Sequence, residues 1–296
     1  MADDRHPEFQ YLDLLRDIVN EGTDKGDRTG TGNRYLFSRH MRFSLRDQFP
    51  ILTTKRVYWR GVVEELLFFL RGDTDSTHLE DKKVKIWEGN TRREFLDKKG
   101  LTTLPEGDIG CAYSHQWRNF GGEHPHLPET KGQQGFDQVK DVLKTLKTNP
   151  LDRRMIITGW CPTQTHMMAL PSCHVLYIFN VNPETNELNC HMTQRSCDTF
   201  LGVPFNISSM ALMTCLFAKV SGLKPGEISW LGVDVHLYRD HLSLAIEQMM
   251  RDPKPFPTLN IRKDLNSLED IEALVYEDLE LIGYKPHKAI KAKMAV

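Results

Sequence analysis

Residues 169–213 have the sequence ALPSCHVLYIFNVNPETNELNCHMTQRSCDTFLGVPFNISSMALM, which combines strand-like patterning with three kinds of chemical group. Cys173 is a candidate nucleophile, Gln194-Arg195-Ser196 is a candidate anion site, and Asn206 is a polar side chain expected after a turn. The alternating apolar residues between these groups predict strands. Three kinds of chemistry on one short scaffold favour a small-molecule active site over a binding module.

The composition is typical of a soluble globular protein. The chain has 296 residues, of which 40% are hydrophobic and 26% charged, and its formal net charge of -2 offers no general basic field to nucleic acid. No apolar run approaches the ~20 residues of a membrane-spanning helix, and the N-terminus lacks the apolar core of a signal peptide. The six cysteines have no zinc-ligand spacing. We therefore expect reduced thiols in a cytoplasmic protein, with nuclear entry left open.

Hydrophobic periodicity predicts a mixture of helices and strands. The expected helices are 8–21, 58–70, 136–147 and 208–222, and the expected strands are 34–45, 155–160 and 229–238. GGEHPHLPETKGQQG, within the Gly-, Pro- and His-rich segment 98–135, has the composition of a mobile surface loop, and the tail is expected to be polar. The pattern contains no repeat or linker, so we expect a single domain over residues 1–296.

Several charged groups have two interpretations at this stage. Glu64 and Glu65 are neighbours on an apolar helix, where side chains point about 100° apart, so that one can face a cleft and the other solvent. Alternatively, both lie at the edge of the apolar stripe. The loop 27–32 either closes over a phosphate, with Arg28 as bidentate donor, or is an exposed turn. Arg153 and Arg154 are either solvated or bind phosphate, one of them for another subunit.

Other candidates are weaker. His124 and His126 lie in a loop without further ligands in the sequence, so we expect them to be solvated and to hold no metal. The pair Ile86-Trp87 stands among charged residues and is expected to be a packing contact. Cys197 is a rival nucleophile, ranked below Cys173 because it lies inside the anion-binding motif.

Taken in chain order, the blocks DRTGTG, LTTKR, EELL, IW, DRR, MALPSCH, QRSCD, LGVPFN and DVHLY resemble those of the thymidylate synthase family. The resemblance extends from about residue 8 to Val296, and the pair QRSCD and LGVPFN is its most specific part. It implies reductive methylation of dUMP to dTMP with 5,10-methylenetetrahydrofolate, which leaves as dihydrofolate, and no metal. It also implies an α/β (α+β) fold with a central mixed sheet, helices on one face, and a homodimer formed sheet to sheet.

The resemblance assigns roles that can be checked chemically. Addition of the Cys173 thiolate to C6 of uracil makes C5 nucleophilic, and a thiol of pKa ~8.5 needs a nearby cation, for which Arg195 is the match. The amide of Asn206 offers a donor and an acceptor to the uracil edge, whereas aspartate would favour cytosine. Glu65, rather than Glu64, matches the residue that organises water for proton transfer. The polar network is completed by Tyr113, His174 and Asp198.

The same resemblance implies two binding sets. The residues expected to bind dUMP are Arg28, Arg195, Ser196, Asp198, Asn206, His236 and Tyr238, with Arg153 and Arg154 contributed by a partner chain. The residues expected to bind folate are Lys55, Ile86, Trp87, Asn90, Asp198, Leu201, Gly202, Phe205 and Val296.

The sequence departs from the usual family pattern at Cys111, Ser114, Cys161, Ser172, Met210 and Val233. Each change leaves the acid, base or nucleophile in place, so it bears on rate and local geometry more than on reaction class. Two alternatives stay open: a pyrimidine-nucleotide hydroxymethylase on the same scaffold, and a homologue without catalysis that binds RNA or another protein. Trp87 and Asn206 argue against the first, and the near-neutral charge and complete polar set argue against the second.

Overall fold

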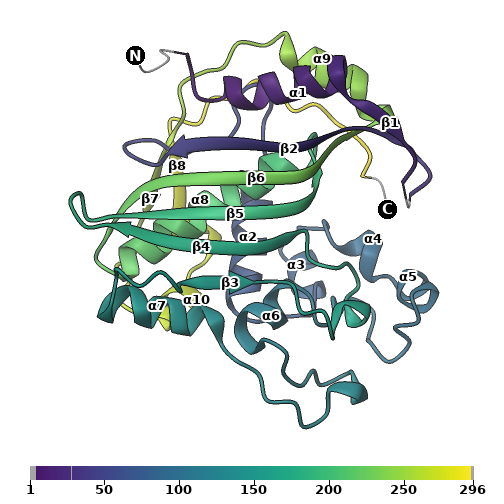
Figure 1. The fold of residues 1–296 in the computed structure, drawn as a ribbon, viewed down its shortest axis with the longest axis vertical. Coiled ribbons are helices and arrows are strands. Elements are labelled where there is room, and N and C mark those ends of the chain that lie inside the picture. The colour runs from purple at the N-terminus through teal and green to yellow at the C-terminus, as the bar shows by residue number, and fades with distance from the viewer. Residues whose placement is uncertain (1–4, 28, 295–296) are drawn as a thin grey trace.

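A six-stranded mixed sheet forms the centre of the fold, with strand order β1-β2-β6-β5-β4-β3 (Figure 1). The computed structural model describes residues 5–27 and 29–294. Strands β5 and β6 are parallel and the other neighbours are antiparallel, which confirms the expected mixed sheet. The strands are β1 (Thr23–Lys25), β2 (Asn33–Ser44), β3 (Ile156–Thr158), β4 (His174–Asn182), β5 (Glu187–Asp198) and β6 (Lys224–Tyr238).

Strand register brings the sequence candidates to one edge of this sheet. His174, the first residue of β4, pairs with Gln194 of β5. Near the end of β5, Asp198 pairs with His236 near the end of β6. The start of one strand and the ends of two others therefore meet, and side chains far apart in sequence become neighbours.

The expected helices are all present. They correspond to α1 (Phe9–Glu21), α2 (Trp59–Leu70), α7 (Gln138–Thr148) and α8 (Gly202–Val220). The shorter helices are α3 (Thr77–Glu80), α4 (Glu88–Thr91), α5 (Arg93–Lys98), α6 (Tyr113–Asn119), α9 (Leu242–Met249) and α10 (Leu268–Glu272).

Two regions without a clear periodic signal contain short regular elements. The segment 98–135 includes α6 and a 3₁₀ turn at Pro128–Thr130, and the bridge pair Phe120–Phe136 joins the two ends of the stretch 121–135, for which a loop was expected. The tail, expected only to be polar, forms a second, two-stranded sheet from β7 (Thr258–Ile261) and β8 (Leu279–Ile282). Short elements such as these carry too few residues for a periodic signal, so the sequence does not predict them.

Helix α8 begins six residues earlier than its apolar pattern predicts. The carboxylate of Asp198 accepts the backbone N–H groups of Phe200 and Leu201 at 3.1 Å each, which satisfies donors at the start of the helix. Pro204 is tolerated because it lies in the first turn, where its missing N–H has no helical acceptor. Asn206 therefore lies within the helix rather than after a turn, and the expectation for its backbone was wrong.

By length and composition α8 could cross a membrane, with a mean hydropathy of 1.4, so the expectation that no such run exists was also wrong. However, 83% of that window is buried inside the protein, as in a core helix. α8 packs on β5 and β6, and in Figure 1 it lies behind the sheet with α2. Phe179 of β4 stacks on Phe217 of α8, with ring centroids 5.3 Å apart.

The opposite sheet face is not covered by a helix in Figure 1. Residues that point to it, such as Leu176, Ile178 and Leu231, are half-buried, whereas their strand neighbours Tyr177 and Trp230 are almost fully buried. This alternation is the strand period of two. The same face also carries the polar residues His191, Thr193 and Ser229, so it is a mixed sheet face that the described residues leave open in the single chain.

The turn that carries Lys55 is held from both ends of the chain. The buried carboxylate of Glu8 accepts four hydrogen bonds of 2.6–2.8 Å from the backbone and side-chain groups of Thr53 and Thr54. From the C-terminal segment, the backbone N–H of His287 donates to the carbonyl of Thr53 at 2.7 Å. Such a network fixes the direction in which Lys55 leaves the turn.

Candidate functional site

The thiol of Cys173 lies beside a guanidinium that the backbone holds in place. Arg195 donates to the carbonyl oxygens of Ser172 at 3.0 Å and Pro171 at 2.7 Å, and its Nη2 lies 4.0 Å from Cys173 Sγ. The backbone N–H of Cys173 donates to the Tyr113 hydroxyl at 2.7 Å. A fixed positive charge next to sulfur favours the thiolate, the form that acts as a nucleophile.

Cys197, the rival nucleophile, is sealed inside the protein. It is 0% exposed, its thiol donates to the carbonyl of Gln194 at 3.4 Å, and burial raises its pKa well above the usual value. The structure describes all six cysteines, and five of them are buried, so Cys173 alone is partly exposed. The geometry therefore favours Cys173 as the reactive thiol.

A chain of hydrogen bonds fixes the amide of Asn206. The indole N–H of Trp230 donates to Gln194 Oε1 at 2.9 Å, and Gln194 Nε2 donates to Asn206 Oδ1 at 2.8 Å. Because an indole can only donate, the oxygen of Gln194 must face Trp230 and its amino group must face Asn206. The Asn206 amide consequently has one orientation, with its oxygen toward Gln194 and its amino group on the other side.

Gln194 is 2% exposed and lies on the buried side of β5, so its inclusion in the anion site was wrong. Only Arg195 and Ser196 of that triplet are partly exposed. The role of Trp230 as a donor to Gln194 was not predicted from the sequence, although the parallel register of β5 and β6 places the two residues near each other. Its contact crosses between strands and leaves no motif.

Glu65 faces the same side as Cys173, whereas Glu64 does not. Glu65 Oε1 accepts the indole N–H of Trp87 at 2.9 Å, and burial raises the pKa of its carboxyl to about 7. Glu64 is paired instead with Lys82, at 2.8 Å. Glu64 is only 3% exposed, so the expectation that one of the two carboxylates faces solvent was wrong, and that Glu65 faces the cleft stays a prediction.

Aromatic rings connect Glu65 with Cys173. The ring of Tyr113 makes edge contacts with Trp87 at 5.9 Å and with His174 at 5.3 Å between centroids, and it stacks on Phe69 at 4.8 Å. Burial lowers the pKa of His174 to about 4, against a smaller opposing effect of the Asn206 amide. His174 is therefore a neutral hydrogen-bonding group near pH 7.

His236 and Tyr238 share one face at the end of β6, as their spacing predicts. Their rings are in edge contact at 5.3 Å, and His236 Nδ1 lies 2.9 Å from a carboxylate oxygen of Asp234. Since Ser196 pairs with Asp234 across the strands, these polar groups lie next to the anion-site residues.

Lys55 and Asn90 extend the site beyond the sheet edge. Lys55 donates to the Phe200 carbonyl and its Nζ lies 3.4 Å from the centre of the Phe200 ring, while burial lowers its pKa to about 7. The Nδ2 of Asn90 is buried and has no hydrogen-bond partner within residues 5–27 and 29–294. A buried donor of this kind fits an acceptor on a bound molecule. The partly exposed apolar and small residues nearby are Ile86, Leu201, Gly202 and Phe205.

Arg153 and Arg154 do not join this cluster. Both are exposed, and Arg154 is paired with Asp152 at 2.9 and 2.8 Å. Met155 bonds to Phe179, far along β4 from His174, so at ~3.3 Å per residue the two arginines lie roughly 20 Å from the start of that strand. Arg28 and Val296 lie outside the described residues.

The model of the thymidylate synthase family matches residues 9–296. The chain belongs to the thymidylate synthase family. It is 51% identical over 292 residues to the bifunctional dihydrofolate reductase-thymidylate synthase of Leishmania amazonensis, covering 98% of this chain and 56% of that protein. It is 49% identical over 296 residues to the corresponding protein of Glycine max, covering 100% of this chain and 55% of that protein.

It is also 47% identical over 291 residues to the thymidylate synthase of Homo sapiens, covering 98% of this chain and 91% of that protein. The chain thus spans about half the length of the bifunctional relatives that it matches. These comparisons confirm the family that the ordered sequence blocks indicate.

Where the chain departs from the thymidylate synthase pattern, the changed residues lie mostly behind the site. Five of the six are at most 5% exposed, and Val233 is half-buried. The hydroxyls of Ser114 and Ser172 have no hydrogen-bond partner in the part of the chain that the structure describes. The five buried positions are Cys111, Ser114, Cys161, Ser172 and Met210.

The raised pKa of Glu65 predicts that stability falls as pH rises. The carboxyl holds its proton more tightly when folded, with a pKa of about 7 against 4.5, so a contribution complete below pH 4.5 is lost as pH rises through about 7. This difference corresponds to at most about 3 kcal/mol of unfolding free energy. Glu65→Gln is expected to lack this loss in urea unfolding curves measured from pH 5 to pH 8.

The matched control is Glu94→Gln, which changes an exposed carboxylate and should retain the wild-type pH dependence. If Glu65→Gln and the wild type lose the same free energy of unfolding over this pH range, the assignment of a buried, protonated carboxyl to Glu65 is wrong.

Proposed function

We propose that the chain methylates dUMP at C5 to give dTMP, with 5,10-methylenetetrahydrofolate as co-substrate and dihydrofolate as second product. The observation that carries the proposal is the guanidinium of Arg195 held 4.0 Å from Cys173 Sγ, in the part of the fold that also fixes the Asn206 amide. A nucleophilic thiol beside an oriented amide suits a pyrimidine ring, which needs attack at C6 and recognition at its O4 and N3 edge.

In the proposed reaction, the Cys173 thiolate adds to C6 and moves an electron pair to C5 and O4. C5 then attacks the one-carbon unit of the folate and loses its proton, and the bond from that carbon to the folate nitrogen breaks, which leaves an exocyclic methylene on C5. A hydride from the folate, which becomes dihydrofolate, reduces this methylene to methyl as the Cys173 sulfur leaves C6 and the C5–C6 double bond is restored. Glu65 has a pKa of about 7, so it can both hold and release a proton through ordered water near neutral pH.

The placement of polar groups at the sheet edge supports the proposed nucleotide site. Arg195 and Ser196 would bind the phosphate, Asn206 the pyrimidine, and His236 with Tyr238 the ribose. Asp198 is proposed to support both substrates, because it accepts the N–H groups of Phe200 and Leu201 just before α8 and so fixes the turn between the two proposed sites. The remaining phosphate ligands in the proposal are Arg28 and, from a partner chain, Arg153 and Arg154.

The folate is proposed to lie against Trp87 and the start of α8. Asn90 supplies a buried, unsatisfied donor, and Lys55 a buried amine. The full proposed set is Lys55, Ile86, Trp87, Asn90, Asp198, Leu201, Gly202, Phe205 and Val296.

We also propose a homodimer of single-domain chains, formed through the uncovered sheet face. That face carries half-buried apolar residues, and the nearby Phe37 is 73% exposed. A dimer would cover these apolar residues. It would also allow Arg153 and Arg154, which lie far from Cys173 of their own chain, to reach the site of the partner chain. Light scattering should give twice the chain mass.

The buried state of α8 fits a soluble protein, which we place in the cytoplasm, with nuclear entry possible and no nucleic acid or membrane required.

Product analysis tests the reaction directly. Incubation of the wild type with dUMP and 5,10-methylenetetrahydrofolate should give dTMP and dihydrofolate in equal amounts by mass spectrometry, and Cys173→Ser should abolish both. Cys197→Ser is the matched control and should remain active, because that thiol is sealed from the cleft. Formation of 5-hydroxymethyl-dUMP and tetrahydrofolate would show a hydroxymethylase, and no product from a folded wild type would contradict the enzyme.

Exchange of the Asn206 amide for a carboxylate should change the base that is accepted. Asn206→Asp keeps an oxygen for the Gln194 donor but replaces the ligand-facing amino group by an acceptor, which suits the amino group of cytosine. We expect kcat/KM for dUMP to fall roughly 10²-fold or more, with turnover of dCMP appearing. Asn260→Asp, on β7, is the control. Unchanged preference for dUMP in Asn206→Asp would contradict this role.

A further inference from the structure

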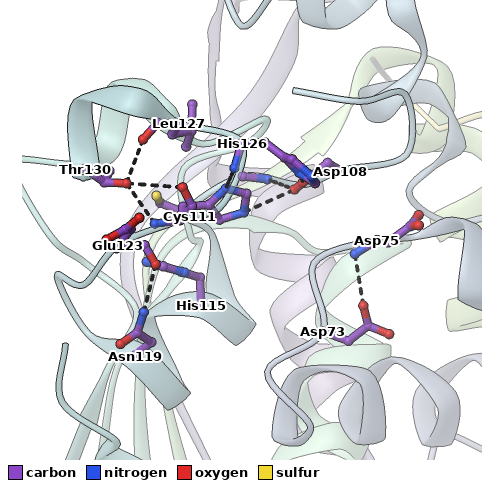
Figure 2. Close-up of polar contacts among 12 residues, drawn as sticks. Asp73, Asp75, Asp108, Cys111, His115, Asn119, Glu123, His126, Leu127 and Thr130 are labelled. Atoms are coloured by element: carbon purple, nitrogen blue, oxygen red, sulfur yellow. Dashed lines mark hydrogen bonds and ion pairs between the residues drawn. The ribbon is translucent and has the colours of Figure 1, made fainter. Parts of the chain in front are cut away.

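A second group of potential ligands lies outside the proposed active site, in the loop region before and after α6. Asp108, His124 and His126 each offer one donor atom, and these atoms lie within 4.8 Å of one another. Figure 2 shows Asp108 and His126 facing each other from two separate stretches of the loop. The sequence predicted two solvated histidines, and for His124 that prediction was wrong, since its side chain is 0% exposed.

The separations of the donor atoms match a coordination shell. Asp108 Oδ2 lies 2.8 Å from His126 Nδ1, and Asp108 Oδ1 lies 3.4 Å from His124 Nε2. Ligands at ~2.0–2.1 Å from a tetrahedral zinc ion are about 3.3 Å apart, so small side-chain movements would bring all three onto one ion. A hydrogen bond between Asp108 and His126 would not by itself require His124 Nε2 to lie beside the same carboxylate.

His124 supplies an independent observation that points to a ligand. Its Nε2 is buried and makes no hydrogen bond within the described residues, because its contact with Asp108 is poorly aligned. An unpartnered buried ring nitrogen is unfavourable unless something completes it. The ring is held from the other side by His115, whose centroid lies 5.3 Å away and whose Nε2 bonds to the Gly122 carbonyl.

We propose that Asp108, His124 and His126 bind a divalent transition-metal ion of the zinc type, with water completing the shell. Two imidazoles and one carboxylate suit such ions better than magnesium or calcium, which prefer oxygen ligands. Asp108 and His124 are buried, whereas the His126 side chain is 45% exposed and gives the ion and its water a path from solvent. This proposal differs from the sequence expectation that no metal is held.

The structure also predicts what must change locally on binding. His124 Nδ1 now accepts the backbone N–H of His126 at 3.3 Å, so the ring proton is on Nε2 when the ring is neutral. Coordination through Nε2 moves that proton to Nδ1, and the His126 amide must then turn away. The ion would replace two hydrogen bonds, the one to His124 Nδ1 and the one between His126 Nδ1 and Asp108 Oδ2 at 2.8 Å, by three metal bonds that join Asp108 to the 124–126 turn.

Asp108 lies five residues before Tyr113, whose hydroxyl contacts the Cys173 backbone. A metal ion would therefore fix the loop that leads to Tyr113 without touching the proposed substrates. This role is structural, and it does not depend on the proposed reaction.

The test is Zn²⁺ binding to the full, untagged chain by calorimetry, with Co²⁺ absorption to identify the ligands. We expect one tight equivalent, and a ligand-field spectrum without a sulfur-to-cobalt charge-transfer band. His126→Asn changes a partly exposed residue, so it should fold and weaken binding by more than about tenfold. Asp108→Asn should weaken binding similarly.

His78→Asn is the matched control. His78 is also a partly exposed imidazole near two carboxylates, at 2.7 Å from Asp73 and 3.9 Å from Asp75, but it has no buried second imidazole. Its removal should leave Zn²⁺ affinity unchanged. The proposal is overturned if no equimolar binding occurs, if folded His126→Asn binds as tightly as the wild type, or if the cobalt spectrum shows thiolate ligands.

Discussion

The contact between Arg195 and Cys173 is the constraint on which the proposed chemistry depends. The guanidinium cannot swing away, because two carbonyl oxygens of the preceding turn accept its N–H groups. Its Nη2 stays 4.0 Å from the sulfur, close enough to favour negative charge there. Burial raises the pKa of the buried thiols where a shift is resolved, and for Cys197 it outweighs the opposing charge of Arg195. These differences favour Cys173 as the reactive thiol.

The fold builds this site by combining one sheet edge with the start of one helix. Parallel pairing of β5 and β6 brings Ser196 and Asp198 level with Asp234 and His236. Asp198 then holds the turn that precedes α8, and the first turns of α8 place Asn206 where Gln194 can orient it. The buried side chains of the core behind the sheet thus determine the direction in which the polar side chains at the sheet edge point.

Long periodic segments were predictable from sequence, and short ones were not. The apolar helices α1, α2 and α7 and the strands β2 and β6 carry enough residues for a clear period, whereas the two short strands of the tail and α6 do not. Within the site, ordered motifs located Cys173, Arg195 and Asn206. The orientation of Asn206 through Trp230 was not predictable, because it depends on strand register and on the fact that an indole can only donate. His124 was misjudged for a related reason, since Asp108 is distant in sequence.

The most direct test of the central claim is mass spectrometry of the chain after incubation with 5-fluoro-dUMP and 5,10-methylenetetrahydrofolate. Fluorine at C5 cannot leave as a proton does, so the reaction should stop with the nucleotide bonded to sulfur and to the folate carbon. If Cys173 is the nucleophile, we expect an intact mass increased by one nucleotide and one folate, with the modified peptide containing Cys173. No adduct from the folded protein, or an adduct on Cys197, would contradict it.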